Sequence, residues 1–214
     1  MPDSPSSSAN QGGMSTAQPE MSDRIWTLPN LISISRLLLL LPLTVWFLVQ
    51  QNYVGALWSL VALGITDWLD GFLARRLNLV TRFGKNLDPL ADRLSVLAVV
   101  WALIVDGILP WPYIVVIAGI DVTVGLLGLA WFGGPPDIPV SRVGKARTAG
   151  ILVSLPLLIL EAATGIEWIG VVGLVILTFS VIGHVWAGLG YLRIMHALHR
   201  TRLAEVAAAK ETQQ

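Results

Sequence analysis

The stretch that decides the fold is Thr66–Arg93, which reads TDWLDGFLARRLNLVTRFGKNLDPLADR. Its acidic residues form two pairs at helical spacing, Asp67 with Asp70 and Asp88 with Asp92, so each pair shares one face of a helix. Apolar segments flank the stretch on both sides, which puts the first pair near the end of one helix and the second at the start of the next. We therefore expect a helical hairpin in which four carboxylates converge, with a connecting loop of roughly a dozen residues.

The rest of the chain has the composition of a membrane protein. Of its 214 residues, 54% are hydrophobic and 13% are charged, whereas about 25% of the residues in a soluble domain are charged. The chain contains no cysteine, which excludes disulfides, thiolate metal ligands and a cysteine nucleophile. The 14 basic and 14 acidic residues cancel, so the net charge indicates no class of partner.

Six apolar stretches are long enough to cross a bilayer, which takes about 20 helical residues. The predicted fold class is an all-α polytopic membrane protein with six transmembrane helices. We expect these helices at Leu31–Val49, Val54–Leu73, Leu87–Val105, Tyr113–Trp131, Ala149–Ala162 and Ile169–Tyr191. The fifth stretch is short, and its helix is expected to extend beyond it at the start.

The two ends of the chain differ from the apolar middle. Residues 1–22 are rich in Ser, Gln, Gly and Pro and are expected to form a disordered cytoplasmic tail. Residues 23–192 would form the membrane domain, and residues 193–214 a cytoplasmic C-terminal tail. In that tail apolar and basic residues alternate at helical spacing, which fits either an amphipathic extension on the anionic membrane surface or a solvated helix end.

The distribution of basic residues predicts the orientation. Of the 14 basic residues, all but Arg36 and Arg93 fall in the termini or in the connections after the second and fourth predicted helices. The other connections carry only acidic charges, at Asp106, Glu161 and Glu167. By the positive-inside rule, both termini and the acidic hairpin face the cytoplasm. The expected location is the inner or plasma membrane.

The acidic hairpin has the composition of a metal site. Clustered carboxylates repel one another and are costly to desolvate near lipid, so cations should neutralise them. Oxygen ligands without His or Cys favour Mg²⁺, Mn²⁺ or Ca²⁺, and two such ions about 4 Å apart would clamp a phosphoryl group for in-line displacement. The alternative is a salt-bridge network with nearby Arg and Lys, which leaves the small residues Gly71, Ala74 and Gly84 on these faces unexplained.

Three segments resemble one enzyme family. The order Asp67-x2-Asp70-Gly71-x2-Ala74-Arg75-x8-Gly84-x3-Asp88-x3-Asp92 resembles the complete signature of the CDP-alcohol phosphatidyltransferases. The segment Thr27–Arg36 is similar to the "PN-(hydroxyl-rich)-R" opening of the first helix in that family. The segment Ser141–Thr148 resembles the "GKxKT" segment of its phosphatidylglycerophosphate synthase and cardiolipin synthase branches.

The resemblance implies an activity and residue roles. The protein would be a homodimeric phosphatidyltransferase that uses CDP-diacylglycerol, releases CMP and needs Mg²⁺ or Mn²⁺, with no nucleic acid among its partners. The metal ligands would be Asp67, Asp70, Asp88 and Asp92, with Asp92 also the general base. The CDP pocket would comprise Thr66, Asp67, Gly71, Ala74, Arg75 and Gly84. Direct attack by the acceptor is expected, because no Ser–His or Cys–His nucleophile lies near the motif.

The acceptor alcohol is expected to be anionic. The residues that would bind it are Arg36, Arg142, Lys145 and Arg147, although topology alone could explain the last three. Ile151 replaces a common Gln and Ile120 a common Arg of the phosphatidylglycerophosphate synthases, which makes a lipid acceptor more plausible. Glycerol 3-phosphate is favoured slightly over phosphatidylglycerol.

Two further polar residues and one rival function complete these expectations. His184 is expected to be a packed histidine hydrogen-bonded across helices rather than a proton shuttle, and Asp121 to belong to a polar network or a dimer contact. A membrane transporter is the remote alternative function. Transport sites lie near the midplane between inverted repeats, whereas these acids are expected at one membrane face.

Overall fold

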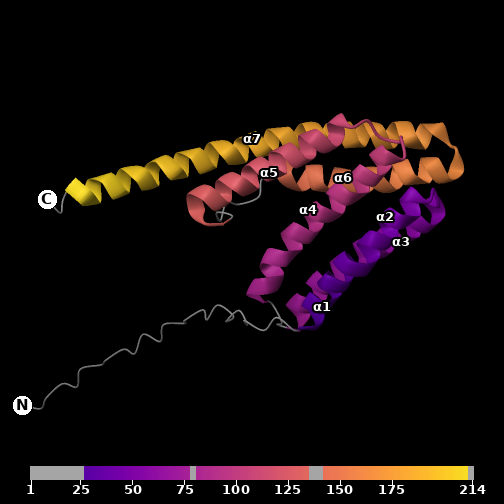
Figure 1. Ribbon diagram of the computed structural model, residues 1–214, viewed down its shortest axis with the longest axis horizontal. Coiled ribbons are helices and arrows are strands. Elements are labelled where there is room, and N and C mark those ends of the chain that lie inside the picture. Colours follow the sequence, from indigo (N-terminus) through magenta and orange to yellow (C-terminus); the bar gives the residue numbers. More distant parts are fainter. Residues whose placement is uncertain (1–26, 78–80, 135–141, 212–214) are drawn as a thin grey trace, which may run out of the picture.

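The computed structural model describes residues 27–77, 81–134 and 142–211, which form helices joined by short connections (Figure 1). The elements are α1 (Leu28–Ser35), η1 (Arg36–Leu40), α2 (Leu41–Val49), α3 (Tyr53–Arg76), α4 (Arg82–Val105), α5 (Pro112–Phe132), α6 (Arg142–Thr164) and α7 (Glu167–Glu211). Since α1, η1 and α2 form one continuous helix, the described ranges hold helices at all six predicted positions. The predicted N-terminal tail lies outside the described residues.

Five of these helices are long and apolar enough to cross a membrane. They are Asn30–Val49, Tyr53–Leu73, Pro112–Phe132, Val143–Thr164 and Glu167–Glu205. Large side chains such as Trp58, Phe179 and Trp186 are mostly exposed on their surfaces, an arrangement that suits lipid rather than water. The protein is therefore a multi-pass membrane protein. A crossing by α4, the remaining predicted span, stays a prediction.

The prediction of a long loop in the acidic hairpin was wrong. Helix α4 begins at Arg82 rather than Leu87, and residues 77–81 alone connect it to α3. Gly84 therefore lies in the first turns of α4, and Asp92 lies well inside the helix rather than at its start. The apolar residues indicate only which part of a helix lies in hydrocarbon. Arg and Lys favour helix and can extend their charged ends to water, so the helix continues beyond the apolar residues.

The first membrane helix contains a wide turn at η1. Pro42 has no N–H and cannot complete the regular ladder of the helix. The backbone N–H of Leu41 instead bonds to the carbonyl of Arg36, five residues earlier, which is the pattern of a π-helix. The wide turn begins at Arg36, the only residue of η1 that is buried among those described.

The helices pack as neighbouring pairs. Helix α6 packs along α7, α2 along α3, and α4 contacts both α2 and α5. Helix α7 packs along both α5 and α6, and Figure 1 shows α4 running from these three helices toward the α2–α3 pair. The buried core between them includes Val99, Val100, Leu103, Leu155, Ile159 and Leu177. Helices from both halves of the chain thus contribute to one core.

Helix α7 continues beyond its membrane-length segment. It runs without a break to Glu211 and extends past the ends of α5 and α6 (Figure 1). The ring of Trp131, at the end of α5, stacks on His199 with 4.7 Å between centroids and 9° between planes. Most of the predicted C-terminal tail is therefore a helical continuation of α7, and this stacking fixes its first turns against α5.

Candidate active site

A buried polar stripe on the first helix faces the acidic hairpin. Asn30, Ser33 and Arg36 follow one another at three-residue steps, so they lie along one side of the helix. Their exposed fractions are 3%, 2% and 1%. Buried polar groups need partners, and the hairpin supplies them.

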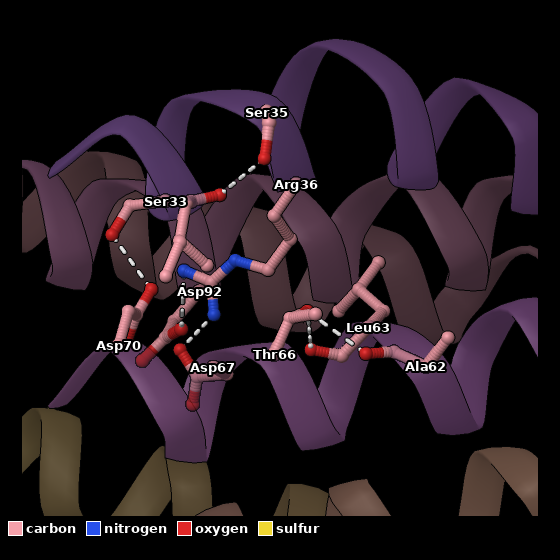
Figure 2. A network of polar contacts seen from close by, with 10 residues as sticks. Ser33, Ser35, Arg36, Ala62, Leu63, Thr66, Asp67, Asp70 and Asp92 are labelled. Atoms are coloured by element: carbon pink, nitrogen blue, oxygen red, sulfur yellow. Dashed lines mark hydrogen bonds and ion pairs between the residues drawn. The ribbon is translucent and has the colours of Figure 1, made fainter. Parts of the chain in front are cut away.

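The first two residues of the stripe bind different parts of the hairpin. The Asn30 amide donates to the Thr81 hydroxyl at 3.0 Å, just before α4 begins. The Ser33 hydroxyl donates to Oδ2 of Asp70 at 2.7 Å, as Figure 2 shows. The opening motif of the chain therefore holds both the connection and one motif carboxylate in place.

Arg36 lies between α3 and α4. Its Nη1 forms an ion pair with Oδ1 of Asp67, and its Nη2 is 3.8 Å from Oδ1 of Asp92 (Figure 2). The guanidinium is always charged and is almost completely buried, so it requires these carboxylates. Because 3.8 Å is too long for a hydrogen bond, Asp92 remains less constrained than Asp67.

Three of the four predicted metal ligands therefore converge. We call Arg36, Asp67, Asp70 and Asp92 the carboxylate centre. Asp70 is buried, whereas the side chains of Asp67 and Asp92 are 43% and 56% exposed. Asp67 and Asp92 can thus present oxygen atoms to a ligand. The hydrogen bond from Ser33 fixes the buried carboxylate of Asp70. The side chain of Asp88 lies outside the described part of the structure.

The donor set fits a hard divalent cation. Its acidic members offer only carboxylate oxygen, the ligand type that Mg²⁺ and Mn²⁺ prefer. Among the described side chains, no three acids or histidines lie close enough together to form a ready metal cage. Among the described residues, Arg36 contributes positive charge to this centre.

The predicted CDP-pocket residues are only partly described. The Thr66 hydroxyl bonds to the carbonyls of Ala62 and Leu63 in its own helix, and Gly71 is half-buried on the same helix as Asp67 and Asp70. The surroundings of the remaining residues with predicted roles lie outside the described side chains: Ala74, Arg75, Gly84, Asp88 and Arg142.

A second polar cluster lies among α4, α5, α6 and α7. The predicted acceptor residue Arg147 contacts Nδ1 of His184 through its Nη1. Nε2 of His184 is 3.6 Å from Oδ1 of Asp121, and Nε of Arg93 is 3.9 Å from the same oxygen. We call Arg93, Asp121, Arg147 and His184 the arginine cluster. It confirms that His184 is packed across helices and that Asp121 belongs to a polar network.

An apolar groove runs beside Arg147 between α6 and α7. Its volume is about 350 Å³. The lining residues are Val143, Ala146, Arg147, Val175, Ile176, Phe179, Ser180 and Gly183. Lys145, another predicted acceptor residue, is exposed on the same helix. The groove thus combines an apolar wall with one cationic side chain.

The sequence interpretation missed the roles of Asn30, Ser33 and Thr81. The signal was present, because a polar residue at every third position of an apolar helix indicates a polar partner for that face. Which partner each residue meets depends on how α1 packs against the hairpin, which the spacing alone does not define.

Fold and site together define a polytopic helical membrane protein with an acidic centre held between its first three helices. The chain belongs to the CDP-alcohol phosphatidyltransferase family, whose model matches residues 26–186. The protein is therefore an enzyme of that family, and the transporter alternative is set aside. The family implies CDP-diacylglycerol and an alcohol as its substrates.

The names of individual relatives refer to two different activities. The chain is 34% identical over 194 residues to "Cardiolipin synthase (CMP-forming)" of Streptomyces coelicolor, covering 86% of this chain and 89% of the relative. It is 37% identical over 142 residues to "Putative cardiolipin synthase" of Mycobacterium tuberculosis, covering 64% and 66%. It is 32% identical over 173 residues to "CDP-diacylglycerol--glycerol-3-phosphate 3-phosphatidyltransferase" of Rickettsia felis, covering 78% and 93%.

Proposed function

We propose that this protein transfers the phosphatidyl group of CDP-diacylglycerol to phosphatidylglycerol, forming cardiolipin and CMP. The observation that carries the choice of acceptor is the surroundings of Arg147. This side chain borders an apolar groove and also contacts His184, beside Asp121. A phosphodiester that bears one negative charge and apolar chains matches these surroundings.

Two of the four predicted acceptor residues, Arg36 and Arg147, already lie near acidic groups, which argues against a small, highly charged acceptor. Arg36 is paired with Asp67 and lies near Asp92, and Asp121 offsets part of the charge around Arg147. Glycerol 3-phosphate carries a phosphomonoester with nearly two negative charges and would need several uncommitted cations. For this reason we place phosphatidylglycerol ahead of glycerol 3-phosphate, reversing the slight preference drawn from the sequence.

The groove offers a place for an acyl chain of the acceptor. It is lined mainly by apolar side chains and lies between two helices that are candidate membrane spans. Arg147 stands among its lining residues, so a phosphate at Arg147 would bring the attached chain to the apolar wall. A lipid chain that moves from the bilayer into the groove stays in apolar surroundings, so the groove would select an acylated acceptor by contact and shape rather than by release from water.

The carboxylate centre would carry out the transfer. The acceptor hydroxyl oxygen attacks the phosphorus of the phosphatidyl group, the bond from that phosphorus to the bridging oxygen breaks, and CMP leaves with the electron pair. Asp92 accepts the hydroxyl proton, Ser33 fixes Asp70, and Arg36 orients Asp67. The residues proposed to contact the CDP moiety are Thr66, Asp67, Gly71, Ala74, Arg75 and Gly84.

A divalent cation fits this proposal. Asp67, Asp70, Asp88 and Asp92 would hold Mg²⁺ or Mn²⁺, which would offset the negative charge that develops on the phosphoryl oxygens. The protein residues alone account for positioning and proton acceptance, so the two contributions can be tested separately.

We further propose six crossings with the carboxylate centre on the cytoplasmic side, and a homodimer. The charge bias of the connections supports this orientation. Because the chain has no cysteine, single-cysteine variants can test it. In sealed inverted vesicles, an impermeant thiol reagent should label Lys145→Cys and leave Thr164→Cys unlabelled; the reverse pattern would overturn the orientation.

Glycerol 3-phosphate remains the second candidate. The name of the Rickettsia felis relative favours it. Purified protein should be incubated with CDP-diacylglycerol and Mg²⁺ or Mn²⁺, with each acceptor supplied separately, while CMP release is measured. Release with phosphatidylglycerol alone is the expected result, and release with glycerol 3-phosphate alone would replace the proposal with a phosphatidylglycerophosphate synthase.

A further inference from the structure

The outward face of α7 changes from apolar to basic near the level at which α5 ends. We propose that Arg193 and Arg200 on this face form a site for the headgroups of anionic phospholipids in the adjoining leaflet. The inference goes beyond the proposed function, since it holds for either candidate acceptor. The two arginines lie outside the carboxylate centre, the arginine cluster and the lining of the apolar groove.

One side of α7 faces away from the other helices. Its exposed apolar residues follow one another at steps of three or four: Phe179, Ile182, Trp186 and Leu189. Between 47% and 71% of each is exposed, and on a candidate membrane span such side chains suit lipid. The same spacing leads to Arg193 and Arg200, which are both exposed and point within about 40° of Leu189. The cations therefore continue the face that meets lipid.

The contact between α5 and α7 places these arginines near the membrane boundary. The candidate span in α5 ends at Phe132, and the ring of Trp131 stacks on His199. Tryptophan is enriched at the interface between membrane and water. Arg200 directly follows His199, and Arg193 lies about 9 Å closer to the membrane centre at 1.5 Å per residue. Because arginine can extend its charged end along the helix toward the headgroups, both guanidinium groups suit the headgroup layer.

Neither arginine is in an ion pair with a carboxylate among the side chains that the structure describes. Both remain charged, since a guanidinium keeps its proton in proteins. Anionic headgroups attract basic residues at the membrane surface and would supply the missing negative charge. The alternative is that cytoplasmic segments are basic on every face. Arg202 allows the two explanations to be separated, because it is exposed and points about 180° away from Arg193.

An anionic phospholipid fits this face better than a protein does. Its phosphate would meet the arginines, and its acyl chains would lie along Trp186 and Leu189, which precede them on the same side. A symmetric contact with a second copy would bring identical patches together, so the arginines of the two copies would repel one another. A soluble acidic protein could meet the arginines but not the apolar residues that adjoin them within the bilayer.

Fluorescence quenching can measure lipid selectivity at this face. Because the chain has no cysteine, Leu189→Cys can carry a single bimane label one turn before Arg193. The labelled protein is placed in vesicles of equal parts phosphatidylglycerol and phosphatidylcholine, with only one of the two lipids brominated. Quenching should indicate about fivefold tighter binding of phosphatidylglycerol, which is the effect of a cation near an anionic membrane surface. Phosphatidylserine should bind as well as phosphatidylglycerol, because the site would bind by charge.

Substitutions on the two sides of α7 separate a lipid site from general surface charge. Arg193→Gln and Arg200→Gln should each reduce the preference for the anionic lipid, and together they should remove it. Arg202→Gln makes the same change of charge on the opposite side and should keep the preference. Molar KCl should weaken it, because salt screens exposed charges. Equal losses in Arg200→Gln and Arg202→Gln would indicate general surface charge and overturn the site.

The remaining outcomes also decide the proposal. Equal quenching by the two lipids with all three arginines present would reject the site. Weak quenching by both would show that a second copy covers this face, which also rejects it. The substituted arginines are exposed, so the variants should fold, and unchanged thermal unfolding in detergent would verify this. No outcome depends on CMP release, so the lipid site and the proposed function fail separately.

Discussion

The carboxylate centre and the arginine cluster have opposite charge compositions. In the first, three described carboxylates lie around one buried guanidinium. In the second, one carboxylate lies among two guanidinium groups and an imidazole. Each site lies between helices. Each contains one residue whose charge is opposite to that of the others: Arg36 in the carboxylate centre and Asp121 in the arginine cluster.

This comparison indicates the role of the oppositely charged residue in each site. Arg36 offsets part of the repulsion between the acids, and the remaining negative charge suits cations. Asp121 offsets part of the repulsion between the arginines, and the remaining positive charge suits an anion. The proposed metal-dependent transfer to an anionic acceptor would need both kinds of site, and α4 contributes the consecutive residues Asp92 and Arg93 to them.

The largest expected effect comes from removing divalent metal. Excess EDTA should reduce CMP release to background, because the acids could no longer neutralise charge on the phosphoryl group. Adding Mg²⁺ or Mn²⁺ in excess of the chelator should restore activity. Activity that persists in EDTA would show that Arg36 alone satisfies the carboxylate centre, and the metal proposal would be lost.

Replacing the proposed base should have the next largest effect. Asp92→Asn keeps the size of the side chain but cannot accept the proton, and general bases contribute about 10²–10⁴-fold. We expect kcat to fall by that amount while CDP-diacylglycerol still binds. Glu161→Gln, at the far end of α6, should keep full turnover. A normal kcat in Asp92→Asn would remove this residue as the base.

Releasing Asp70 should have an intermediate effect. Ser33→Ala removes the 2.7 Å hydrogen bond to the buried carboxylate, and loss of a bond to a charged group should lower kcat/KM about tenfold. Ser35→Ala is the matched control, because the Ser35 hydroxyl bonds only to the Ile32 carbonyl of its own helix among the contacts that the structure describes. Equal losses in the two variants would indicate a general effect on α1 rather than on the carboxylate centre.

Filling the apolar groove should have a smaller effect that depends on the acceptor. Ala146→Phe places a ring in the groove beside Arg147 and should raise KM for long-chain phosphatidylglycerol about fivefold. Ala149→Phe, an exposed position of α6 outside the lining, is the control. The effect should disappear with the water-soluble, deacylated acceptor. An unchanged KM for the long-chain lipid would reject the groove as an acyl-chain site.

The smallest effect should fall on stability alone. Thr81→Val removes the hydroxyl that accepts from Nδ2 of Asn30 and donates to Oδ1 of Asn30, and buried hydrogen bonds contribute about 1 kcal/mol each. Thermal unfolding in detergent should shift slightly downward, with kinetic constants close to those of the wild type. A large loss of activity would instead mean that the α3–α4 connection positions the substrate.

The helices and the family could be predicted from the sequence because both depend on local patterns. Apolar stretches located the helices, and the spacing of Asp67, Asp70 and Asp92 located the carboxylate centre. Helix ends could not be predicted from apolarity, since α4 begins at Arg82 within a basic segment. The earlier start of α6, at Arg142, was expected only because its apolar stretch is too short for a membrane span.

The arginine cluster was only partly predictable. His184 and Asp121 could each be recognised as polar residues within apolar helices, which need partners. Their joint contact with Arg93 and Arg147 depends on how four helices pack, and residues far apart in the chain carry no local signal of that arrangement. The same reason explains why Ser33 was not identified as a partner of Asp70.

The wide turn η1 divides the first helix into two segments, and the buried positions of one segment do not continue the helical spacing of the other. Buried positions follow at Asn30, Ser33 and Arg36, then resume at Leu41, Thr44 and Leu48 after a step of five rather than four. One residue has in effect been inserted between a polar recognition surface and an apolar packing surface. Deleting a single residue between positions 37 and 40 would rotate one surface against the other by about 100°. A one-residue length change here would therefore disrupt the carboxylate centre without altering any of its side chains.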